Sequence, residues 1–218
     1  MSAPPTPDVP FRLLETMRWE GGIALLDRHL ARLAASAAHF GFRYREHFVL
    51  RLLHEASGDF EGGVARRLRF TLGPGGNLDM TLEHAPLGEH DAIRRAALHP
   101  EPVEAGGPFW RHKTTRRAHY DGPLAWAHTR GADEAILVDA RGHVVEGTRT
   151  TVWVEREGRL LTPPLSAGGL PAVYRAHLLA TRPDAAEAAI TAGDLAAANA
   201  IWLSNAVRGL FRVEEVGP

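Results

Sequence analysis

Lys113 is the only lysine in this chain of 218 residues, and the other 24 of its 25 basic residues are arginine. Arginine keeps its charge permanently, whereas a lysine can be tuned to lose its proton and form a Schiff base with a carbonyl compound. Lys113 is therefore a candidate covalent catalyst. A surface cation left over by an arginine-rich composition explains the residue equally well, so its meaning depends on the rest of the chain.

Two other charged residues are of types that could serve a cofactor. Glu146 ends a predicted strand and stands directly before Gly147. It is either a solvated carboxylate or a partner for a heterocyclic nitrogen. Arg32 lies on the polar side of a predicted helix, where it is either a solvated arginine or a functional one. For each residue alone, solvation is the simpler explanation.

The stretch from Thr162 to Arg175 predicts a loop that leads into a helix beginning at Pro171. Proline is favoured in the first turn of a helix, and that turn offers free N–H groups and a partial positive charge to an anion. Gly168 and Gly169 would let a phosphate approach the backbone. The pattern is consistent with phosphate binding, but many helices without ligands begin in this way.

Composition excludes several kinds of site. The chain has no cysteine, which excludes disulfides and thiol nucleophiles, and its 12 histidines show no spacing typical of a metal site. A formal net charge of -1 gives no electrostatic basis for binding nucleic acid or a membrane surface. No apolar run approaches the ~20 residues that cross a bilayer, and the first residues lack the pattern of a signal peptide. We expect a cytoplasmic protein that acts on a small molecule without a metal.

Hydrophobic periodicity predicts the elements that must position these residues. Helices are predicted at 28–39, with Asp27 as N-cap and an end near Gly41, and at 46–57, 116–129 and 171–181. Glycine and proline at 73–76 indicate a hairpin. Strands are predicted at residues 11–18, 64–72, 78–83, 92–98, 134–138, 143–146, 150–155, 159–161, 186–190, 200–203 and 210–214.

The segment 100–108 is dense in proline and glycine and is the strongest candidate for a domain boundary. Helices and strands alternate irregularly on both sides of it. The predicted class is therefore α+β or α/β with two domains, an N-terminal one at residues 1–105 and a C-terminal one at residues 106–218 that contains Lys113.

Six short motifs follow one another along nearly the whole chain. They are residues 14–18 (Leu-Glu-Thr-Met-Arg), 28–33 with Ser36 and Ala37, 112–116 (His-Lys-Thr-Thr-Arg), 146–148 (Glu-Gly-Thr), 162–164 with 169–171, and 203–209. Together they resemble the class IV aminotransferases, the fold-type IV pyridoxal-phosphate enzymes. Within that family they are most similar to 4-amino-4-deoxychorismate lyases, especially lyase domains fused to aminodeoxychorismate synthase.

The resemblance implies a small N-terminal α/β sandwich domain, a larger C-terminal pseudo-barrel domain and pyridoxal 5'-phosphate as cofactor. Lys113 would bind the cofactor covalently and then move protons, and Glu146 would pair with its pyridinium nitrogen. Arg32 and the backbone N–H groups of Val173 and Tyr174 would hold its phosphate. The residues expected at the substrate are Thr16, Arg18, Arg208 and Asn205.

The implied activity is a lyase reaction that forms 4-aminobenzoate and pyruvate in folate biosynthesis, with a homodimer and a functional link to aminodeoxychorismate synthase. The alternative is a class IV aminotransferase acting on branched-chain or D-amino acids. A third reading is a homologue that binds cofactor or a partner without turnover. It is motivated by Thr151, Ala172 and Ala206, which stand where the family more often has asparagine, glycine and a hydroxyl residue. The chain also lacks most of the N-terminal hairpin of longer members, which resembles the fused lyase domains.

Overall fold

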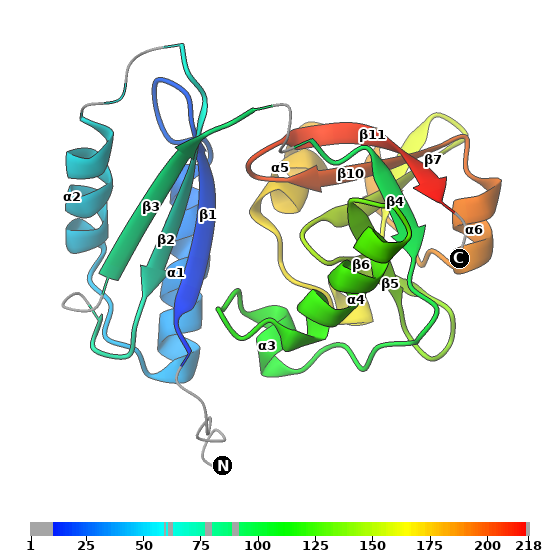
Figure 1. The fold of residues 1–218 in the computed structure, drawn as a ribbon, viewed down its shortest axis with the longest axis horizontal. Helices are drawn as coiled ribbons and strands as arrows, with labels where there is room; N and C mark the ends of the chain where they lie inside the picture. The colour runs from blue at the N-terminus through cyan, green and yellow to red at the C-terminus, as the bar shows by residue number, and fades with distance from the viewer. Residues whose placement is uncertain (1–10, 59, 61–62, 77–79, 89–91, 217–218) are drawn as a thin grey trace. The chain divides into compact units, whose positions relative to one another are not determined.

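The computed structural model describes residues 11–58, 60, 63–76, 80–88 and 92–216, which form two compact units (Figure 1). The first unit contains the chain up to Gly88 together with His112–Arg116, and the second contains Glu89–Arg111 and the chain from Arg117. This division differs from the expected boundary at 105/106. The chain leaves the first unit earlier and returns to it for five residues around Lys113, because those residues pair with its first strand.

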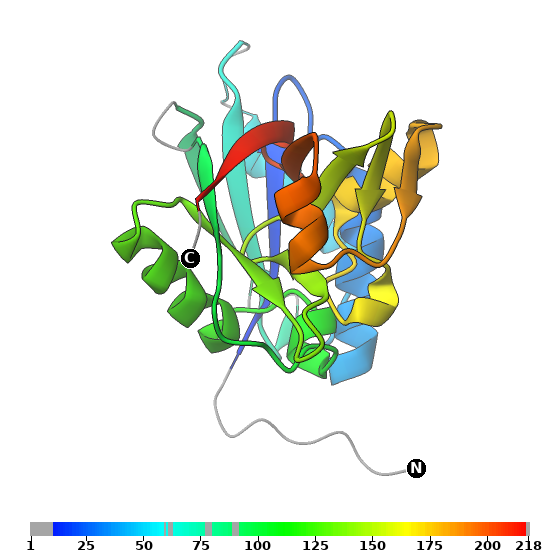
Figure 2. The same cartoon turned by 90° about the vertical axis from the view of Figure 1, so that its right-hand side faces the viewer.

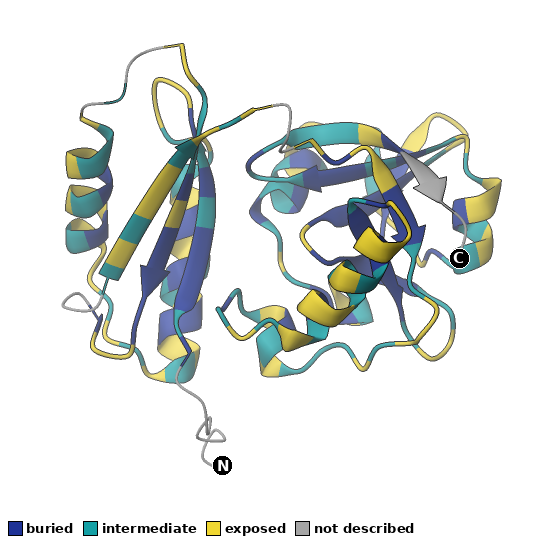
Figure 3. Ribbon diagram, in the orientation of Figure 1, coloured by how far each residue is buried: buried dark blue, intermediate teal, exposed yellow. Residues whose placement is uncertain are grey.

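The first unit is a three-stranded antiparallel sheet with two helices. Its strands β1 (Leu13–Trp19), β2 (Arg66–Leu72) and β3 (Met80–Pro86) lie in that order. Helix α1 (Leu26–Phe40) packs on β1, and α2 (Glu46–Ser57) packs on β3. Figure 3 shows β1 largely buried and β3 largely exposed. The predicted hairpin joins β2 to β3, and residues 77–79 lie outside the described part of the chain.

Helix α1 begins before the predicted N-cap. Leu25 occupies the N-cap position, with φ 55° and no side-chain capping bond, and Asp27 lies in the first turn. A carboxylate there stabilises the helix through its dipole instead of through a capping hydrogen bond. The predicted end is confirmed, because Gly41 closes α1 in the left-handed conformation at φ 71°.

The second unit is built on one eight-stranded sheet with the order β6-β5-β4-β11-β10-β7-β8-β9. Strand β4 runs parallel to both of its neighbours, β5 and β11. Strand β5 is antiparallel to β6, and β10 is antiparallel to both β11 and β7. Ribbons of the unit are seen in Figures 1 and 2. The strands are β4 (Arg95–Leu98), β5 (Glu134–Val138), β6 (Val144–Gly147), β7 (Thr151–Arg156), β8 (Arg159–Thr162), β9 (Ala185–Glu187), β10 (Ala200–Asn205) and β11 (Gly209–Val216).

Alternation along the strands gives this sheet two apolar faces. In β5, Ile136 and Val138 join an interior cluster that draws on seven strands of the sheet, whereas Ala135 and Leu137 pack with helix α4 (Ala118–Thr129). Helix α5 (Val173–Thr181) covers another part of the outer face through Leu178. A sheet with an apolar inside and helices outside is the expected form of a barrel.

The two ends of this sheet are joined by backbone contacts. The Val144 N–H at the start of β6 donates to the Ile190 carbonyl at 2.7 Å, and His143 forms an antiparallel bridge with Thr191, just after β9. The sheet therefore curls until its first and last strands meet through the chain that follows β9. This curled sheet is the pseudo-barrel that the resemblance implied.

Two short helices were not predicted. Helix α3 (Pro108–Arg111) follows the proline-rich segment, and α6 (Ala192–Ala197; orange in Figure 2) follows β9. The signal for α6 was a capping box. Thr191 Oγ1 accepts from the Asp194 N–H at 3.1 Å, and the Asp194 carboxylate accepts from the Thr191 N–H at 2.8 Å. Among the described residues, every helix is too short or too polar to cross a bilayer.

The turn after β2 requires a glycine at position 76. Gly76 has φ +72°, and a Cβ added there would lie 2.3 Å from the Arg43 carbonyl oxygen. We predict that Gly76→Ala lowers the free energy of unfolding by more than the ~1–2 kcal/mol typical of a left-handed L-residue alone.

Gly21→Ala is the matched control for this prediction. Gly21 has φ +69° but no atom within 4 Å of the added Cβ. Urea unfolding of both variants separates conformational strain from steric clash. Equal losses in the two variants would contradict a role for the Arg43 contact.

Candidate active site

Backbone pairing with β1 places Lys113 in the first unit. The Leu14 N–H donates to the Lys113 carbonyl at 2.9 Å, and the Thr115 N–H donates to the Arg12 carbonyl at 2.9 Å. Between them, Leu13 and Thr114 form an antiparallel bridge. The lysine is thus held like a strand residue, with its side chain half-buried.

His112 is anchored to α1 immediately before the lysine. Its Nδ1 lies 2.9 Å from the Ser36 hydroxyl, and its ring stacks on His39 with centroids 4.3 Å apart. Burial, assisted by the neighbouring His39, lowers the pKa of His112. The anchor therefore favours a neutral imidazole next to Lys113.

Arg32 is fixed by a buried carboxylate on β1. Its Nε and Nη2 donate to the two oxygens of Glu15 at 2.8 and 2.6 Å. The Nδ1 of His29 lies 2.7 Å from the same carboxylate. Burial alone would raise the pKa of Glu15, but the adjacent Arg32 and the hydrogen bonds from His29 and Arg32 lower it to about 2. Glu15 therefore stays ionised and sets the plane of the Arg32 guanidinium.

Sequence reasoning gave Glu15 no role, although a signal was present. Residues alternate across a strand, and Glu15 shares a face of β1 with Leu13 and Met17, which are buried in the core. A carboxylate on the core-facing side of a strand implies a buried cationic partner. Thr16 and Arg18, two predicted substrate residues, lie on the opposite face, and Arg18 forms an ion pair with Glu20 at 2.8 Å.

In the second unit, Glu146 is held from two sides. The Tyr120 hydroxyl donates to its Oε1 at 2.6 Å, and the Leu170 N–H donates to its Oε2 at 3.1 Å. A Cβ added at Gly169 would lie 3.2 Å from the carboxylate carbon, so the glycine lets the loop close over the carboxylate. Glu146 is thus a buried, oriented carboxylate and not a solvated one at a strand end. Sequence reasoning did not identify Tyr120.

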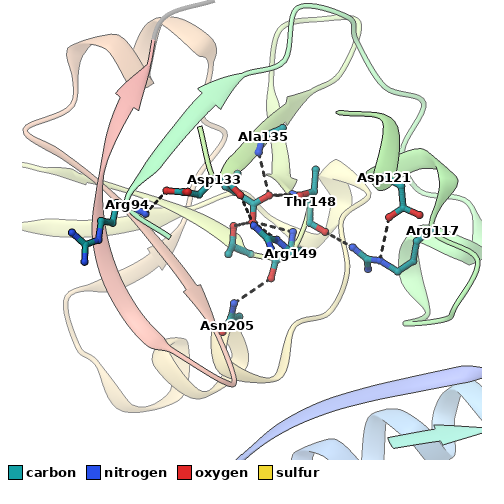
Figure 4. Close-up of polar contacts among 10 residues, drawn as sticks. Arg94, Arg117, Asp121, Asp133, Ala135, Thr148, Arg149 and Asn205 are labelled. Carbon is teal, nitrogen blue, oxygen red and sulfur yellow. Dashed lines mark hydrogen bonds and ion pairs between the residues drawn. The ribbon is translucent and has the colours of Figure 1, made fainter. Parts of the chain in front are cut away.

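The turn that follows Glu146 is organised by a second carboxylate. Glu134 is fully buried in β5 and accepts from the Thr148 N–H at 2.9 Å, the Arg149 N–H at 3.2 Å and the Thr150 hydroxyl at 3.2 Å. The Thr148 hydroxyl also donates to it. Figure 4 shows these contacts converging on one carboxylate. Burial raises the pKa of Glu134, against the opposing effect of Arg149.

Asn205 links this turn to the one that carries Arg208. The Asn205 side-chain oxygen accepts from the N–H groups of Val207 and Arg208 at 3.1 and 2.9 Å, and its amide nitrogen lies 3.5 Å from the Arg149 carbonyl (Figure 4). Both polar atoms of the Asn205 side chain therefore bind backbone groups. Its role in the structure is therefore to shape the turn before Arg208.

The helix predicted to bind an anion begins two residues later than expected. Ala172 is the N-cap of α5, which starts at Val173 and continues with Tyr174. Alanine has no polar side-chain atom, so it leaves the N–H groups of the first turn to water or to a ligand. The buried Arg175 anchors this turn by donating to the Pro163 carbonyl at 2.8 Å and pairing with Glu187.

The sequence-predicted site residues thus fall into two groups. Lys113, Arg32, Thr16 and Arg18 belong to the first unit. The second unit contributes Glu146, Val173, Tyr174, Asn205 and Arg208. The described residues contain no group of three or more histidine, cysteine or acidic side chains that could hold a metal ion.

Comparison with known proteins identifies the family. The family model for class IV amino-transferases matches residues 12–216, so the chain belongs to the class IV aminotransferases, a family of pyridoxal-phosphate enzymes. A protein of Schizosaccharomyces pombe named "Putative aminodeoxychorismate lyase" is 30% identical over 77% of this chain and 72% of its own length.

Two solved structures resemble the chain over most of its length. A crystal structure described as a "Putative amino-acid aminotransferase" from Mesorhizobium loti is 35% identical, with TM-score 0.85, and the match covers 94% of this chain and 100% of the other. A structure described as "Putative 4-amino-4-deoxychorismate lyase" is 28% identical, with TM-score 0.78, over 100% of this chain and 91% of the other.

The residues described above fit the family cofactor chemically. A pyridinium nitrogen that carries a proton requires an ionised carboxylate, and Glu146 is held by two donors that favour the charged form. A phosphate is bound by backbone N–H donors or by a guanidinium; the start of α5 in the second unit offers the former and Arg32 in the first unit is the latter. The one amine with a tunable pKa in this arginine-rich chain, apart from the N-terminus, is Lys113.

The Glu15 pKa predicts a pH dependence of stability. Because folding lowers this pKa from 4.5 to about 2, the stabilisation is complete above pH 4.5 and is lost as the pH falls towards 2. The loss attributable to this buried residue is about 3 kcal/mol. Urea unfolding monitored by circular dichroism across this window measures it, and Glu15→Gln should flatten the profile.

Glu55→Gln is the control for this measurement, because Glu55 is 64% exposed in a surface pair with Arg51. The control should retain the wild-type slope of unfolding free energy against pH. If this slope is the same for the wild type and both variants, Glu15 does not titrate as described.

Proposed function

We propose that this protein is a pyridoxal-phosphate lyase that converts 4-amino-4-deoxychorismate to 4-aminobenzoate and pyruvate. The observation that carries the proposal is the similarity to the Schizosaccharomyces pombe protein of that name, which extends over 77% of this chain and 72% of the relative. The full coverage of this chain by the similar structure described as a lyase supports it.

Each cofactor contact is proposed for a residue with the appropriate chemistry. Lys113 binds the cofactor covalently, and Glu146 pairs with its ring nitrogen. Arg32 and the N–H groups of Val173 and Tyr174 bind its phosphate. When bound, pyridoxal phosphate supplies an electron sink for bonds at the amine-bearing carbon of the substrate.

The chain supplies proton transfer and orientation. With the cofactor and substrate bound, the Lys113 amine would take the proton from the amine-bearing carbon of the substrate and return a proton at the end of the reaction. The backbone pairing with β1 fixes the main chain of this lysine, so that its movement is limited to the side chain. Burial and the neighbouring His39 lower the pKa of His112, so the residue next to Lys113 in the chain favours its neutral form.

The substrate carries carboxylates, and we propose Arg208 and Arg18 as their partners, with Thr16 as a further polar contact. The Asn205 turn fixes the backbone of Arg208. Thr16 and Arg18 point to the same side of β1, because they are two residues apart on a strand. We also propose that the enzyme works as a cytoplasmic homodimer in folate biosynthesis, functionally linked to aminodeoxychorismate synthase.

A second candidate function is transamination of branched-chain or D-amino acids. The relationship to the Mesorhizobium loti protein described as an aminotransferase favours it, since that match is 35% identical and covers 94% of this chain. The same lysine, glutamate and phosphate ligands would serve both reactions. The reactions differ in whether the substrate loses pyruvate or transfers its amino group.

Turnover distinguishes the two functions. With aminodeoxychorismate as the sole substrate, we expect release of 4-aminobenzoate and pyruvate in equal amounts without an amino-group acceptor. No release, together with conversion of the bound cofactor to pyridoxamine phosphate by branched-chain or D-amino acids, would favour the aminotransferase. The absence of turnover on every substrate, in protein that retains cofactor, would support a binding homologue.

Covalent attachment tests the central residue. Reduction of the cofactor-loaded protein with borohydride, followed by peptide mapping, should label Lys113, the only lysine side chain. Lys113→Arg should abolish the label and lower kcat by several orders of magnitude, because arginine keeps its proton. A folded, cofactor-supplied wild type without a label on Lys113 would refute the assignment.

A further inference from the structure

Tyr120 makes a short hydrogen bond to Glu146. Its hydroxyl lies 2.6 Å from Oε1, and the backbone N–H of Leu170 engages Oε2 at 3.1 Å. The two donors come from α4 and from the loop before α5, and each occupies a different oxygen. The carboxylate can rotate only by breaking one of these bonds.

The tyrosine is itself held in place. It is 6% exposed on α4, and its ring meets Trp110 edge-to-face with centroids 5.0 Å apart. The Arg117 guanidinium lies 4.8 Å from the ring centroid and donates to the Thr148 carbonyl at 2.8 Å. Tyr120 is therefore positioned by the same turn that follows Glu146.

The hydroxyl of Tyr120 can act only as a donor to this carboxylate. Burial first, and then the adjacent Glu146, raises the pKa of the Tyr120 hydroxyl, with Arg117 acting in the opposite direction. The phenol therefore remains protonated, and a carboxylate that accepts hydrogen bonds favours its ionised form. Each carboxylate oxygen has two acceptor positions, so neither bond by itself excludes a second donor at the same oxygen.

We propose that Tyr120 is a positioning residue that orients Glu146 and keeps it ionised, so that Glu146 can hold a proton on the ring nitrogen of the cofactor. This inference rests on the proposed function, in which Glu146 pairs with that nitrogen. Tyr120 does not touch the reacting atoms. It acts through the geometry and the charge of Glu146.

The test uses Tyr120→Phe, Glu146→Gln and the control Tyr44→Phe in the full chain. Tyr44→Phe removes the same hydroxyl from a residue of the first unit, whereas Glu146 belongs to the second. Pyridoxal phosphate is titrated into each apo-protein. We expect Tyr120→Phe to weaken binding about tenfold. It should also change the ratio of the bound cofactor's visible and near-ultraviolet bands in the same direction as Glu146→Gln, and by less. Tyr44→Phe should change neither.

The apo-protein provides a readout that does not depend on cofactor. Urea unfolding gives the fold-change in the unfolding equilibrium constant for Tyr120→Phe, for Glu146→Gln and for the double variant. If the two side chains are coupled, the fold-change of the double variant should be about ten times smaller than the product of the two single fold-changes. Additive effects would show that the two side chains are not coupled. 3-Fluorotyrosine introduced in place of Tyr120 preserves the ring and strengthens the donor, so the band ratio should shift in the opposite direction. This substitution keeps the test valid if Tyr120→Phe folds poorly.

The outcomes separate the inference from the function on which it rests. If Glu146→Gln changes affinity and spectrum while Tyr120→Phe changes neither, the inference is wrong and the role of Glu146 stands. If Glu146→Gln also leaves both unchanged, the proposed pairing of Glu146 with the cofactor is wrong, and the inference falls with it.

Discussion

A carboxylate removed from water must have its oxygens occupied by donors, and three buried glutamates impose this constraint on the candidate site. Glu15 takes its donors from Arg32 and His29, Glu134 from the 148–150 turn, and Glu146 from Tyr120 and Leu170. Each is less than a tenth exposed. Because an unpaired buried charge costs several kcal/mol, breaking the hydrogen bond of any one donor is unfavourable. The carboxylates therefore fix the guanidinium, the turn and the loop that the proposed function uses.

Lys113 is supported in a different way, because backbone hydrogen bonds between residues 113–115 and the start of β1 place its main chain. This difference in support follows from what each group must do in the proposed function. Groups that must stay charged and oriented are held by hydrogen bonds to their side chains. A lysine that changes its bond partners requires a fixed main chain and a side chain able to move.

Local pattern predicted much of the fold but little of the long-range pairing. The predicted strand at 134–138 coincides with β5, whose apolar run Ala135–Val138 is the pattern of a strand buried on both faces. Composition and motif singled out Lys113 and Glu146 as candidates. Tyr120 was not, since its role depends on a residue 26 positions away on another element. The return of 112–116 to the first unit was also missed, because non-contiguous strand pairing leaves no periodic signal.

Residues 112–116 also affect the outer edge of the first sheet. Strand β1 is the outer strand of the order β1-β2-β3, and its free side carries the Leu14 N–H and the Arg12 carbonyl that bind the lysine segment. An unprotected outer strand invites pairing with another chain. A fragment that stopped at Gly88 would lose this cover and present a template for self-association. The segment that carries the lysine thus also covers the beginning of an outer strand that could otherwise pair with another chain.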